Sequence, residues 1–194
     1  MLEQGNKELA PGPLETVGQN RFAAGRLGTL WIAWIPEGLV MVELRGEPPP
    51  AEVRRRWLPE VDEIPERALP REVYEILGRY FEGEPVDPAT LPVRLSGTKF
   101  QKGAWAALRK VPRGQVRTYA GLAKDAGSPR AMRAVGMAMG ANPIPIVVPC
   151  HRCVGHGYTL GGFSGGLDKK RFLLELEGVV VDGDHVHPGQ LELL

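Results

Sequence analysis

The chain of 194 residues contains little cysteine and no long hydrophobic run. Its only two cysteines, Cys150 and Cys153, exclude a framework of disulfide bonds and fit a reducing compartment, so we expect a cytoplasmic protein. No apolar stretch approaches the roughly 20 residues that span a bilayer, and residues 1–5 lack the basic and apolar regions of a signal peptide. We therefore expect neither membrane insertion nor secretion.

Acidic residues are nearly absent from one part of the chain. Residues 96–152 carry 10 basic side chains and a single acidic one, Asp125, for a net charge of +9, although the whole chain carries only +1. The flanking segments are acidic, with −5 over residues 1–95 and −3 over residues 153–194. Such a basic block is expected to face a polyanion such as nucleic acid, with an ordinary solvated face as the alternative.

The N-terminal part is expected to combine strands and helices. β-Branched and aromatic residues predict a hairpin around the turn Pro36-Glu37, and two helices follow before a proline-rich linker over residues 83–92. The predicted strands span residues 26–35 and 38–44, and the predicted helices span residues 51–58 and 71–81. A domain boundary near residue 90 would divide the chain into domains over residues 1–90 and 91–194.

The C-terminal part is expected to be mainly helical. Its predicted helices span residues 101–110, 119–126, 130–140 and 168–176. Thr118 introduces the second of these, and Ser128 and Pro129, as N-cap and first helical residue, open the third. Two short helices around a tight glycine turn are typical of a helix-turn-helix.

The helix predicted over residues 130–140 is unusual for a segment that reads the major groove. Ala131, Ala134 and Gly136 leave few side chains for reading base edges, but such small residues permit a close approach of backbone to backbone. Arg133 is the one long cationic side chain in the middle of this helix. It could enter a duplex as the inserted side chains of minor-groove binders do, with an ordinary surface arginine as the alternative.

A thiol stands beside an imidazole in the motif Pro149-Cys150-His151-Arg152. The motif follows an apolar run over residues 144–148, which begins after the turn Asn142-Pro143. A thiolate is the strongest common side-chain nucleophile, and a neighbouring base in a preorganised site generates it at neutral pH. The sequence therefore predicts chemistry at Cys150.

Eight short motifs follow one another with spacings typical of one protein family. They are Gly97-Thr98-Lys99-Phe100-Gln101, Val111-Pro112-Arg113-Gly114, Thr118-Tyr119, Arg133-Ala134-Val135-Gly136, Asn142-Pro143, Pro149-Cys150-His151-Arg152, Ser164-Gly165-Gly166 and Glu177-Gly178. In this order they resemble the O6-alkylguanine-DNA alkyltransferases over residues 96–179. A weaker likeness extends to the hairpin at residues 28–30 and 38–39.

The resemblance implies an α+β fold, with an N-terminal ribonuclease-H-like α/β domain and a mainly helical C-terminal domain that holds a winged-helix-like helix-turn-helix. It implies DNA repair by direct, irreversible transfer of an alkyl group from O6-alkylguanine to Cys150, once per protein molecule, after the base is flipped out through the minor groove. O4-alkylthymine is left open as a second substrate. The implied partner is double-stranded DNA that contains the lesion, and the protein is expected to act as a monomer without a metal or organic cofactor.

The resemblance also implies roles for single residues. Cys150, an ordered water, His151 and Glu177 would form the reactive chain, with Asn142 bracing the turn. Tyr119 and Met139 would contact the base, and backbone groups at Cys150, Cys153 and Ser164 would recognise the guanine edge. Arg133 would fill the gap in the duplex, beside the small residues Ala131, Ala134 and Gly136.

Other functions stay open at this point. One alternative is a protein that binds the lesion without transferring the alkyl group, but such relatives lack the cysteine that Cys150 supplies here. The other is a helix-turn-helix regulator, which would have to bind a defined DNA sequence although its recognition helix has few side chains that read bases. Cys153 stands where the family usually has valine, and the resulting Cys-x-x-Cys spacing predicts some sensitivity to oxidation.

Overall fold

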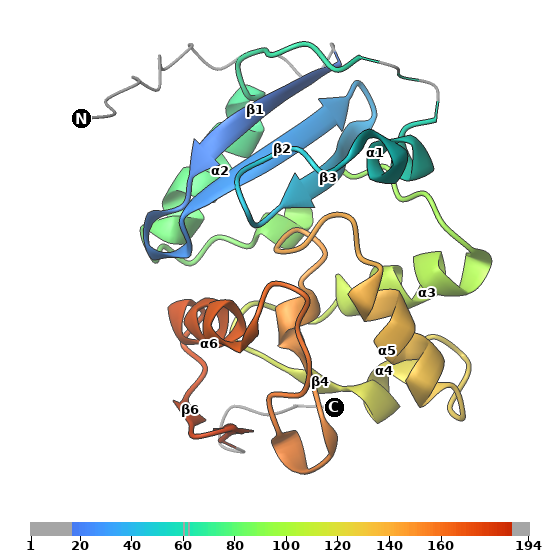
Figure 1. Cartoon of the computed structure of the whole chain (residues 1–194). Coiled ribbons are helices and arrows are strands. Elements are labelled where there is room, and N and C mark those ends of the chain that lie inside the picture. Colours follow the sequence, from blue (N-terminus) through green and yellow to red (C-terminus); the bar gives the residue numbers. More distant parts are fainter. Residues whose placement is uncertain (1–16, 60, 62, 188–194) are drawn as a thin grey trace.

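The computed structural model describes residues 17–59, 61 and 63–187. Its N-terminal half contains three strands and two α-helices, and Figure 1 shows them above the mainly helical C-terminal half. The elements of the N-terminal half are β1 (Gly18–Ala23), β2 (Thr29–Ile35), β3 (Gly38–Glu43), α1 (Ala51–Trp57) and α2 (Arg71–Phe81), with 3₁₀ turns at Gly25–Leu27 and Pro88–Thr90.

The three strands form one antiparallel sheet in the order β1-β2-β3. The predicted hairpin of β2 and β3 is confirmed, but β2 begins at Thr29 rather than at residue 26, because Gly25–Leu27 forms a 3₁₀ turn and Gly28 has a φ of +91°. Strand β1 has a largely polar sequence and was not predicted. It joins the sheet by pairing with β2 along its whole length.

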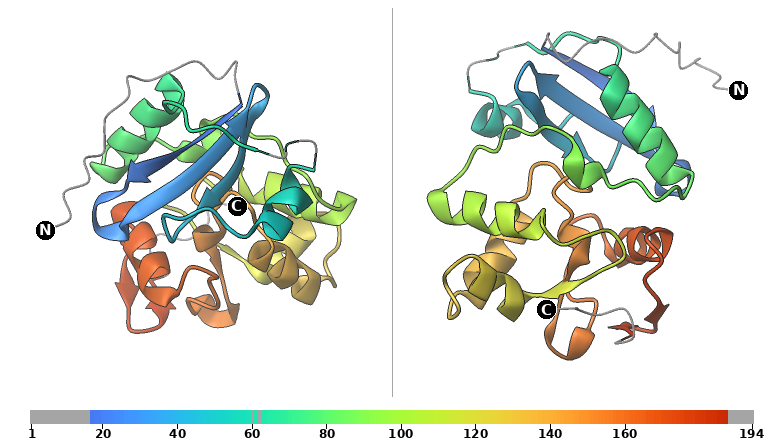
Figure 2. Two further views of the ribbon diagram at one scale, coloured as in Figure 1. Left: turned by 45° about the horizontal axis from the view of Figure 1, so that its top comes forward. Right: turned by 180° about the vertical axis from the view of Figure 1, so that it is seen from behind.

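Helix α2 covers one face of the sheet (Figure 2). The ring of Phe22 on β1 lies 5.8 Å from that of Tyr74 and 6.1 Å from that of Phe81, both on α2. Every residue of β2 after Thr29 is buried, as expected for a strand covered on both faces, where a continuous apolar run replaces alternation. The C-terminal half therefore contributes to the cover of this sheet.

The free edge of β3 pairs with two segments that follow later in the chain. The Leu39 N–H donates to the Pro92 carbonyl at 2.9 Å, and the Arg94 N–H donates to the Leu39 carbonyl at 2.9 Å. Three residues further along β3, the Val42 N–H donates to the Pro143 carbonyl at 2.8 Å. The edge strand is thus covered by chain that leads to the C-terminal half, and the two halves share backbone hydrogen bonds.

The C-terminal half has three packed helices, a fourth helix and short strands. Its elements are α3 (Lys99–Leu108), β4 (Arg117–Thr118), α4 (Tyr119–Asp125), α5 (Met132–Gly140), β5 (Cys153–Val154), α6 (Leu167–Leu176), β6 (Val181–Asp182) and β7 (His185–Val186), with 3₁₀ turns at Cys150–Arg152 and His156–Tyr158. Strands β4 and β5 pair in parallel, and β6 and β7 form an antiparallel pair. Helices α3, α4 and α5 pack against one another.

Two predicted helix starts shift in the structure. Thr98 and Gln101 form a capping box, so α3 begins at Lys99 and not at residue 101. The predicted start of α5 at Arg130 is wrong: the helix begins at Met132, and Ser128 is not its N-cap. Instead the Ser128 carbonyl accepts the Ala131 N–H at 2.8 Å, because the proline after Ser128 favours the second position of a β-turn. Thr118 does cap α4, as predicted.

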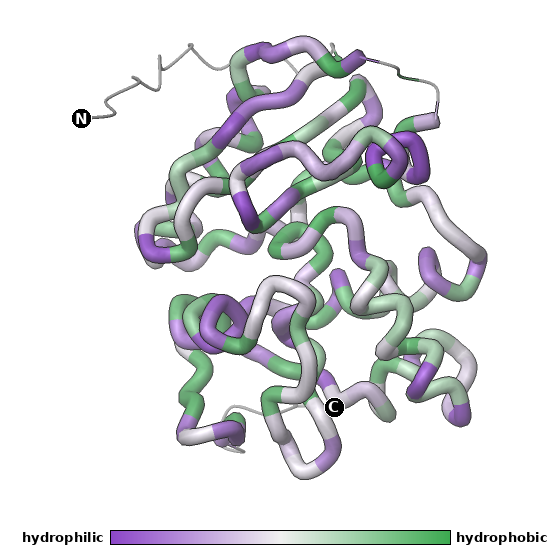
Figure 3. Tube along the Cα trace, viewed as in Figure 1, coloured by the Kyte–Doolittle hydropathy of each residue, from purple (hydrophilic) through white to green (hydrophobic). Residues whose placement is uncertain are grey.

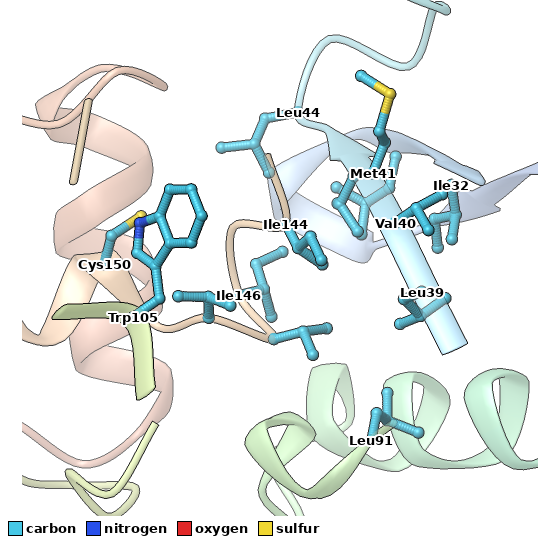
Figure 4. Close-up of a cluster of buried hydrophobic side chains, with 14 of the residues drawn as sticks. Ile32, Leu39, Val40, Met41, Leu44, Leu91, Trp105, Ile144, Ile146 and Cys150 are labelled. Carbon is cyan, nitrogen blue, oxygen red and sulfur yellow. The ribbon is translucent and has the colours of Figure 1, made fainter. Parts of the chain in front are cut away.

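One hydrophobic core runs through both halves. Ile144 and Ile146 lie between the residues of β3 and the pair Trp105 and Cys150 (Figure 4). Figure 3 shows the loop that carries them as a hydrophobic segment directly beneath the sheet. The indole of Trp105 is fully buried and donates its N–H to the Ala138 carbonyl at 2.9 Å, which ties α3 to α5.

None of the helices described in the structure is long and apolar enough to cross a membrane.

We predict that Gly38→Ala destabilises the protein where the two halves meet. Gly38 has a φ of +137°, and a Cβ atom there would lie 2.6 Å from the carbonyl carbon and oxygen of Pro92. The free energy of unfolding in urea should fall by about 2 kcal/mol or more. Gly78→Ala is the matched control, because its Cβ would meet nothing within 4 Å and helix α2 should gain about 0.5–1 kcal/mol. Equal stabilities for the two variants would contradict this account.

Candidate active site

Asn142 holds the apolar run that leads to the thiol. Its side-chain oxygen accepts the Ile144 N–H at 3.0 Å, and its amide nitrogen donates to the Val148 carbonyl at 2.8 Å. The same nitrogen lies 3.1 Å from Sγ of Cys150. One amide side chain therefore fixes both ends of the run and contacts the sulfur. The run is a buried loop and not a strand, with Ile146 at a φ of +76°.

Cys150 opens a 3₁₀ turn and is only 4% exposed. Burial raises the pKa of the Cys150 thiol, while the hydrogen bond from Asn142 lowers it by a smaller amount. Burial likewise raises the pKa of Cys153 to about 12. Both cysteines are free thiols, and the predicted sensitivity of the Cys-x-x-Cys pair to oxidation stays a prediction.

Glu177 is the centre of a buried hydrogen-bond network behind Cys150. Its Oε1 accepts hydrogen bonds from the Tyr80 hydroxyl at 2.8 Å, from Nε2 of His151 at 2.9 Å and from the Arg152 guanidinium at 2.8 Å. Its Oε2 accepts a second bond from Arg152 at 2.9 Å. Burial alone would raise the pKa of the Glu177 carboxyl, but His151 and Arg152 hold that pKa well below its usual range. Glu177 is therefore ionised.

Arg152 joins this network to the segment that connects the two halves. Its guanidinium is fully buried and makes a second two-point ion pair with Asp87, at 2.8 and 3.0 Å. It also donates to the Val111 carbonyl at 2.7 Å. Burial alone would lower the pKa of Arg152, but the Glu177 and Asp87 carboxylates raise it. The predicted linker over residues 83–92 thus supplies a side chain to the core.

The contacts of His151 define which of its ring nitrogens is free to accept a proton. The ionised Glu177 can only accept hydrogen bonds, so Nε2 of His151 carries the proton that it donates. The opposite nitrogen, Nδ1, is buried and has no hydrogen-bond partner among the residues that the structure describes. Burial has the largest effect on the pKa of His151 and lowers it; the Arg152 and Lys170 cations lower it further, while Glu177 raises it, and the net shift is downward. The ring is therefore neutral near pH 7, and Nδ1 carries no proton and can accept one.

A cavity of about 230 Å³ opens at the thiol. Its lining residues come from α4, α5, the 3₁₀ turn and the loop before α6, and they are Tyr119, Gly136, Met139, Gly140, Cys150, Gly162, Phe163 and Ser164. A larger groove of about 720 Å³ lies between the two halves and shares Gly140 and Ser164 with the cavity, but Cys150 does not line it. The cavity is therefore the space in which a molecule can meet the sulfur.

The structure brings most of the predicted site residues together. Cys150, Tyr119, Met139, Gly136 and Ser164 surround the cavity, with His151 and Glu177 behind the thiol. Cys153 contacts the Tyr119 hydroxyl, and burial, with smaller contributions from the two thiols, raises the pKa of Tyr119 to about 12. Tyr119 therefore keeps its proton and can donate it to a hydrogen bond.

Three of the four residues predicted to contact DNA do not line the cavity. Arg133 is exposed on α5, whereas Ala134 and Ala131 are half-buried at the start of this helix. Gly136, three residues after Arg133, lines the cavity. A Cβ atom added at Gly136 would lie 4.0 Å from the ring of Tyr119. The exposed side of α5 is thus continuous with the cavity wall.

Lys170 is an important residue that the sequence analysis did not identify. Its ammonium group is fully buried and donates to the carbonyls of Cys153, at 2.6 Å, and of Leu160 and Gly162. These bonds hold the loop before α6 against the strand that follows the thiol, and burial lowers the pKa of Lys170 to about 8. A sequence signal was present: Lys170 and Glu177 share one helical face with the buried Leu173 and Leu174, at spacings of 3, 4 and 7 residues.

Within the described part of the chain, no group of three histidine, cysteine, aspartate or glutamate side chains could hold a metal ion. His156, His185 and His187 are all exposed.

Comparison with known proteins gives consistent matches. The family model described as 6-O-methylguanine DNA methyltransferase, DNA binding domain, matches residues 99–179. The methylated-DNA–protein-cysteine methyltransferase of Methanosarcina acetivorans is 40% identical over 152 residues, which cover 78% of this chain and 93% of that protein. The protein of the same name from Haemophilus influenzae is 47% identical over 118 residues, or 61% of this chain and 64% of that protein. The chain thus matches less than two thirds of the Haemophilus protein.

Solved structures show the same similarity. The crystal structure of Mycobacterium tuberculosis OGT in complex with DNA has 34% sequence identity and a TM-score of 0.68, covering 84% of this chain and 93% of that chain. The two proteins share a fold that mixes helices and sheet.

We predict that Arg152→Met is strongly destabilising, because it leaves the buried carboxylate of Glu177 without its cation and removes the partner of Asp87. The free energy of unfolding in urea should fall by about 3–5 kcal/mol. Arg79→Met is the control: it breaks an ion pair with Glu84 at 2.6 Å on the exposed surface and should cost about 1 kcal/mol or less. A loss below about 1 kcal/mol for Arg152→Met would show that the network contributes little to stability.

Proposed function

The chain belongs to the family of methylated-DNA–protein-cysteine methyltransferases, and we propose from this premise that it repairs DNA by moving an alkyl group from O6 of guanine to Cys150. The observation that carries the proposal is the position of Cys150 on the cavity wall, with a neutral His151 and an ionised Glu177 behind it. DNA as the partner is supported by the complex of the related Mycobacterium protein.

The proposed reaction is a single displacement at carbon. Sγ of Cys150 forms a bond to the alkyl carbon while the bond between that carbon and O6 of guanine breaks. The thiol proton passes through a water molecule to Nδ1 of His151 and returns to the guanine that leaves. The product is a thioether, which cannot be displaced under the same conditions, so each molecule acts once as a suicide enzyme.

The pKa shifts of the site support a base-assisted reaction. Because burial raises the pKa of Cys150, the thiol stays protonated until a base removes its proton. Nδ1 of His151 is that base, and the Glu177 carboxylate stabilises the imidazolium as it forms. Asn142 donates to the sulfur and stabilises the developing negative charge there.

The cavity has the scale of one nucleobase and not of a duplex, so the damaged nucleotide must leave the helix to reach Cys150. We assign Met139 to the face of the flipped base, and the Tyr119 hydroxyl to a hydrogen bond that stabilises guanine as it leaves. Backbone groups at Cys153 and Ser164 bind the guanine edge. Cys153 is buried beside Tyr119, and Ser164 lies on the cavity wall, which supports these roles.

Helix α5 is the proposed DNA-contacting element. Ala131, Ala134 and Gly136 allow its backbone to approach the minor groove, and Arg133 enters the stack in place of the extruded nucleotide. The exposure of Arg133 and the continuity of this side of α5 with the cavity wall support the assignment. The basic block over residues 96–152 supplies attraction to phosphates without sequence preference.

We also propose how the two halves of the fold are classified. The three-stranded sheet with α2 supports a ribonuclease-H-like domain over residues 1–90, and α4 with α5 supports a winged helix-turn-helix in a domain over residues 91–194. We further propose a cytoplasmic monomer, supported by two free thiols and by a site built within one chain.

We predict that the mass of the protein increases after incubation with duplex DNA that contains one O6-methylguanine. Intact-protein and peptide mass spectrometry should find one added methyl group, on Cys150, with guanine restored in equal amount and no change in Cys150→Ser. Lesion binding without a change of mass would instead support a lesion-recognition protein. Sequence-specific binding that survives Cys150→Ser would support a regulator.

We also predict how the transfer rate depends on pH. Because burial lowers the pKa of His151, the neutral base persists below the usual imidazole range, and the second-order transfer rate should stay level from about pH 8 to about pH 6.5. It should fall at more acidic pH, as His151 gains a proton. Circular dichroism at each pH would verify that the protein remains folded. A rate that rises about tenfold per unit between about pH 7 and pH 9 would show that spontaneous ionisation of Cys150, and not His151, makes the nucleophile.

A further inference from the structure

The exposed side of α5 carries an unusual set of residues. Arg133, Gly136, Met137 and Gly140 follow one another at spacings of 3, 4 and 7 residues, so they lie on one face of the helix. The opposite face holds Val135, Ala138 and Met139, which are buried. The face of α5 that holds Arg133 thus presents one cation, one large apolar side chain and two glycines.

Met137 is the most exposed large hydrophobic side chain among the described residues, at 76%. Its helix neighbours Gly136 and Gly140 line the cavity that holds Cys150, while Met137 itself does not. The thioether therefore projects beside the cavity, from the helix wall that the damaged nucleotide must pass. An apolar group in that place has no partner within the described protein surface.

The surroundings of Met137 favour nucleic acid as its partner. Helix α5 has no acidic residue, and it lies within the block that carries a net charge of +9. Methionine offers no strong hydrogen-bond donor or acceptor, so it cannot read the edges of bases. It can pack its polarisable thioether against the face of a base, as the apolar wedges of minor-groove proteins do.

We propose that Met137 is a second inserted side chain, which packs against the base pair next to the extruded nucleotide while Arg133 occupies the gap. The two residues are four apart, or about 6 Å along the helix axis. Base pairs are stacked about 3.4 Å apart, so the two side chains can reach neighbouring steps of one duplex. This inference rests on the proposed function and adds a positioning residue to it.

The test compares three variants. Met137→Ala removes the wedge, Met137→Leu keeps an apolar side chain, and Met132→Ala is the matched control, because Met132 is 50% exposed and lies about 100° around the helix from Arg133. Single-turnover transfer to Cys150 is measured with two substrates, a duplex with one O6-methylguanine and the free base O6-methylguanine. In parallel, 2-aminopurine beside the lesion reports on local unstacking through its fluorescence.

Met137→Ala should lower the ratio of the duplex rate to the free-base rate about tenfold, the order of effect expected when one methionine side chain loses its burial. It should also reduce the 2-aminopurine signal, whereas Met137→Leu and Met132→Ala should keep the ratio within about twofold of the wild type. Equal losses on both substrates would indicate a structural role, and an unchanged ratio would show that Met137 does not contact DNA. Either result overturns the proposal.

Failure of the proposed function would be recognised separately, because the wild-type protein would then transfer no methyl group from either substrate. In that case the affinities of the wild type and of Met137→Ala for the lesion duplex are compared directly. Weaker binding by Met137→Ala would support the insertion of Met137, and equal affinities would overturn it.

Discussion

The buried ion pair between Glu177 and Arg152 is the interaction on which the rest of the site depends. Taking two charges out of water is costly, and the cost is offset only where each charge is paired and hydrogen-bonded. Here Glu177 accepts four hydrogen bonds from Tyr80, His151 and Arg152, and Arg152 divides its guanidinium between Glu177, Asp87 and the Val111 carbonyl. These partners come from α2, the connecting segment, the turn after α3, and the turn that begins with Cys150, so the network holds both halves of the chain in one arrangement.

This arrangement supports the proposed reaction of a cysteine that is otherwise protected by burial. Burial keeps the thiol of Cys150 protonated, which limits side reactions of a thiolate, and the same burial keeps His151 neutral. Nδ1 of His151 can therefore serve as the proposed base without a change in the protein, and the Glu177 carboxylate would stabilise the imidazolium that the proposed proton transfer forms. Asn142 and Lys170 contribute positioning, since one fixes the loop before the thiol and the other fixes the loop on the far side of the cavity.

Where sequence patterns and structure differ, the difference has a local physical cause. The pair Ser128 and Pro129 suits an N-cap as well as a β-turn, and here the hydrogen bond from the Ala131 N–H to the Ser128 carbonyl closes the turn, so α5 begins only at Met132. Strand β1 was missed because its polar residues show little of the alternation that marks a strand, and its partner β2 supplies the pairing. Glu177 was named only through the family resemblance, although its spacing from Leu173 and Leu174 already places it on the buried face of the helix.

The sequence by itself predicted a nucleophile at Cys150, a base beside it and the resemblance to one family, because these predictions depend on short motifs whose chemistry is local. It also determined the β2–β3 hairpin and the six α-helices of the described residues to within a few residues, through hydrophobic period and capping residues. Only the tertiary structure decided that Tyr80, Arg152 and Asp87 join Glu177 in one network, which cations are buried and which cavity contains the thiol. Glu177 is 26 residues from His151, and Asp87 is 65 residues from Arg152, so no local pattern links them. Their meeting follows from the packing of the two halves around one core, where each buried charge has to find its partner.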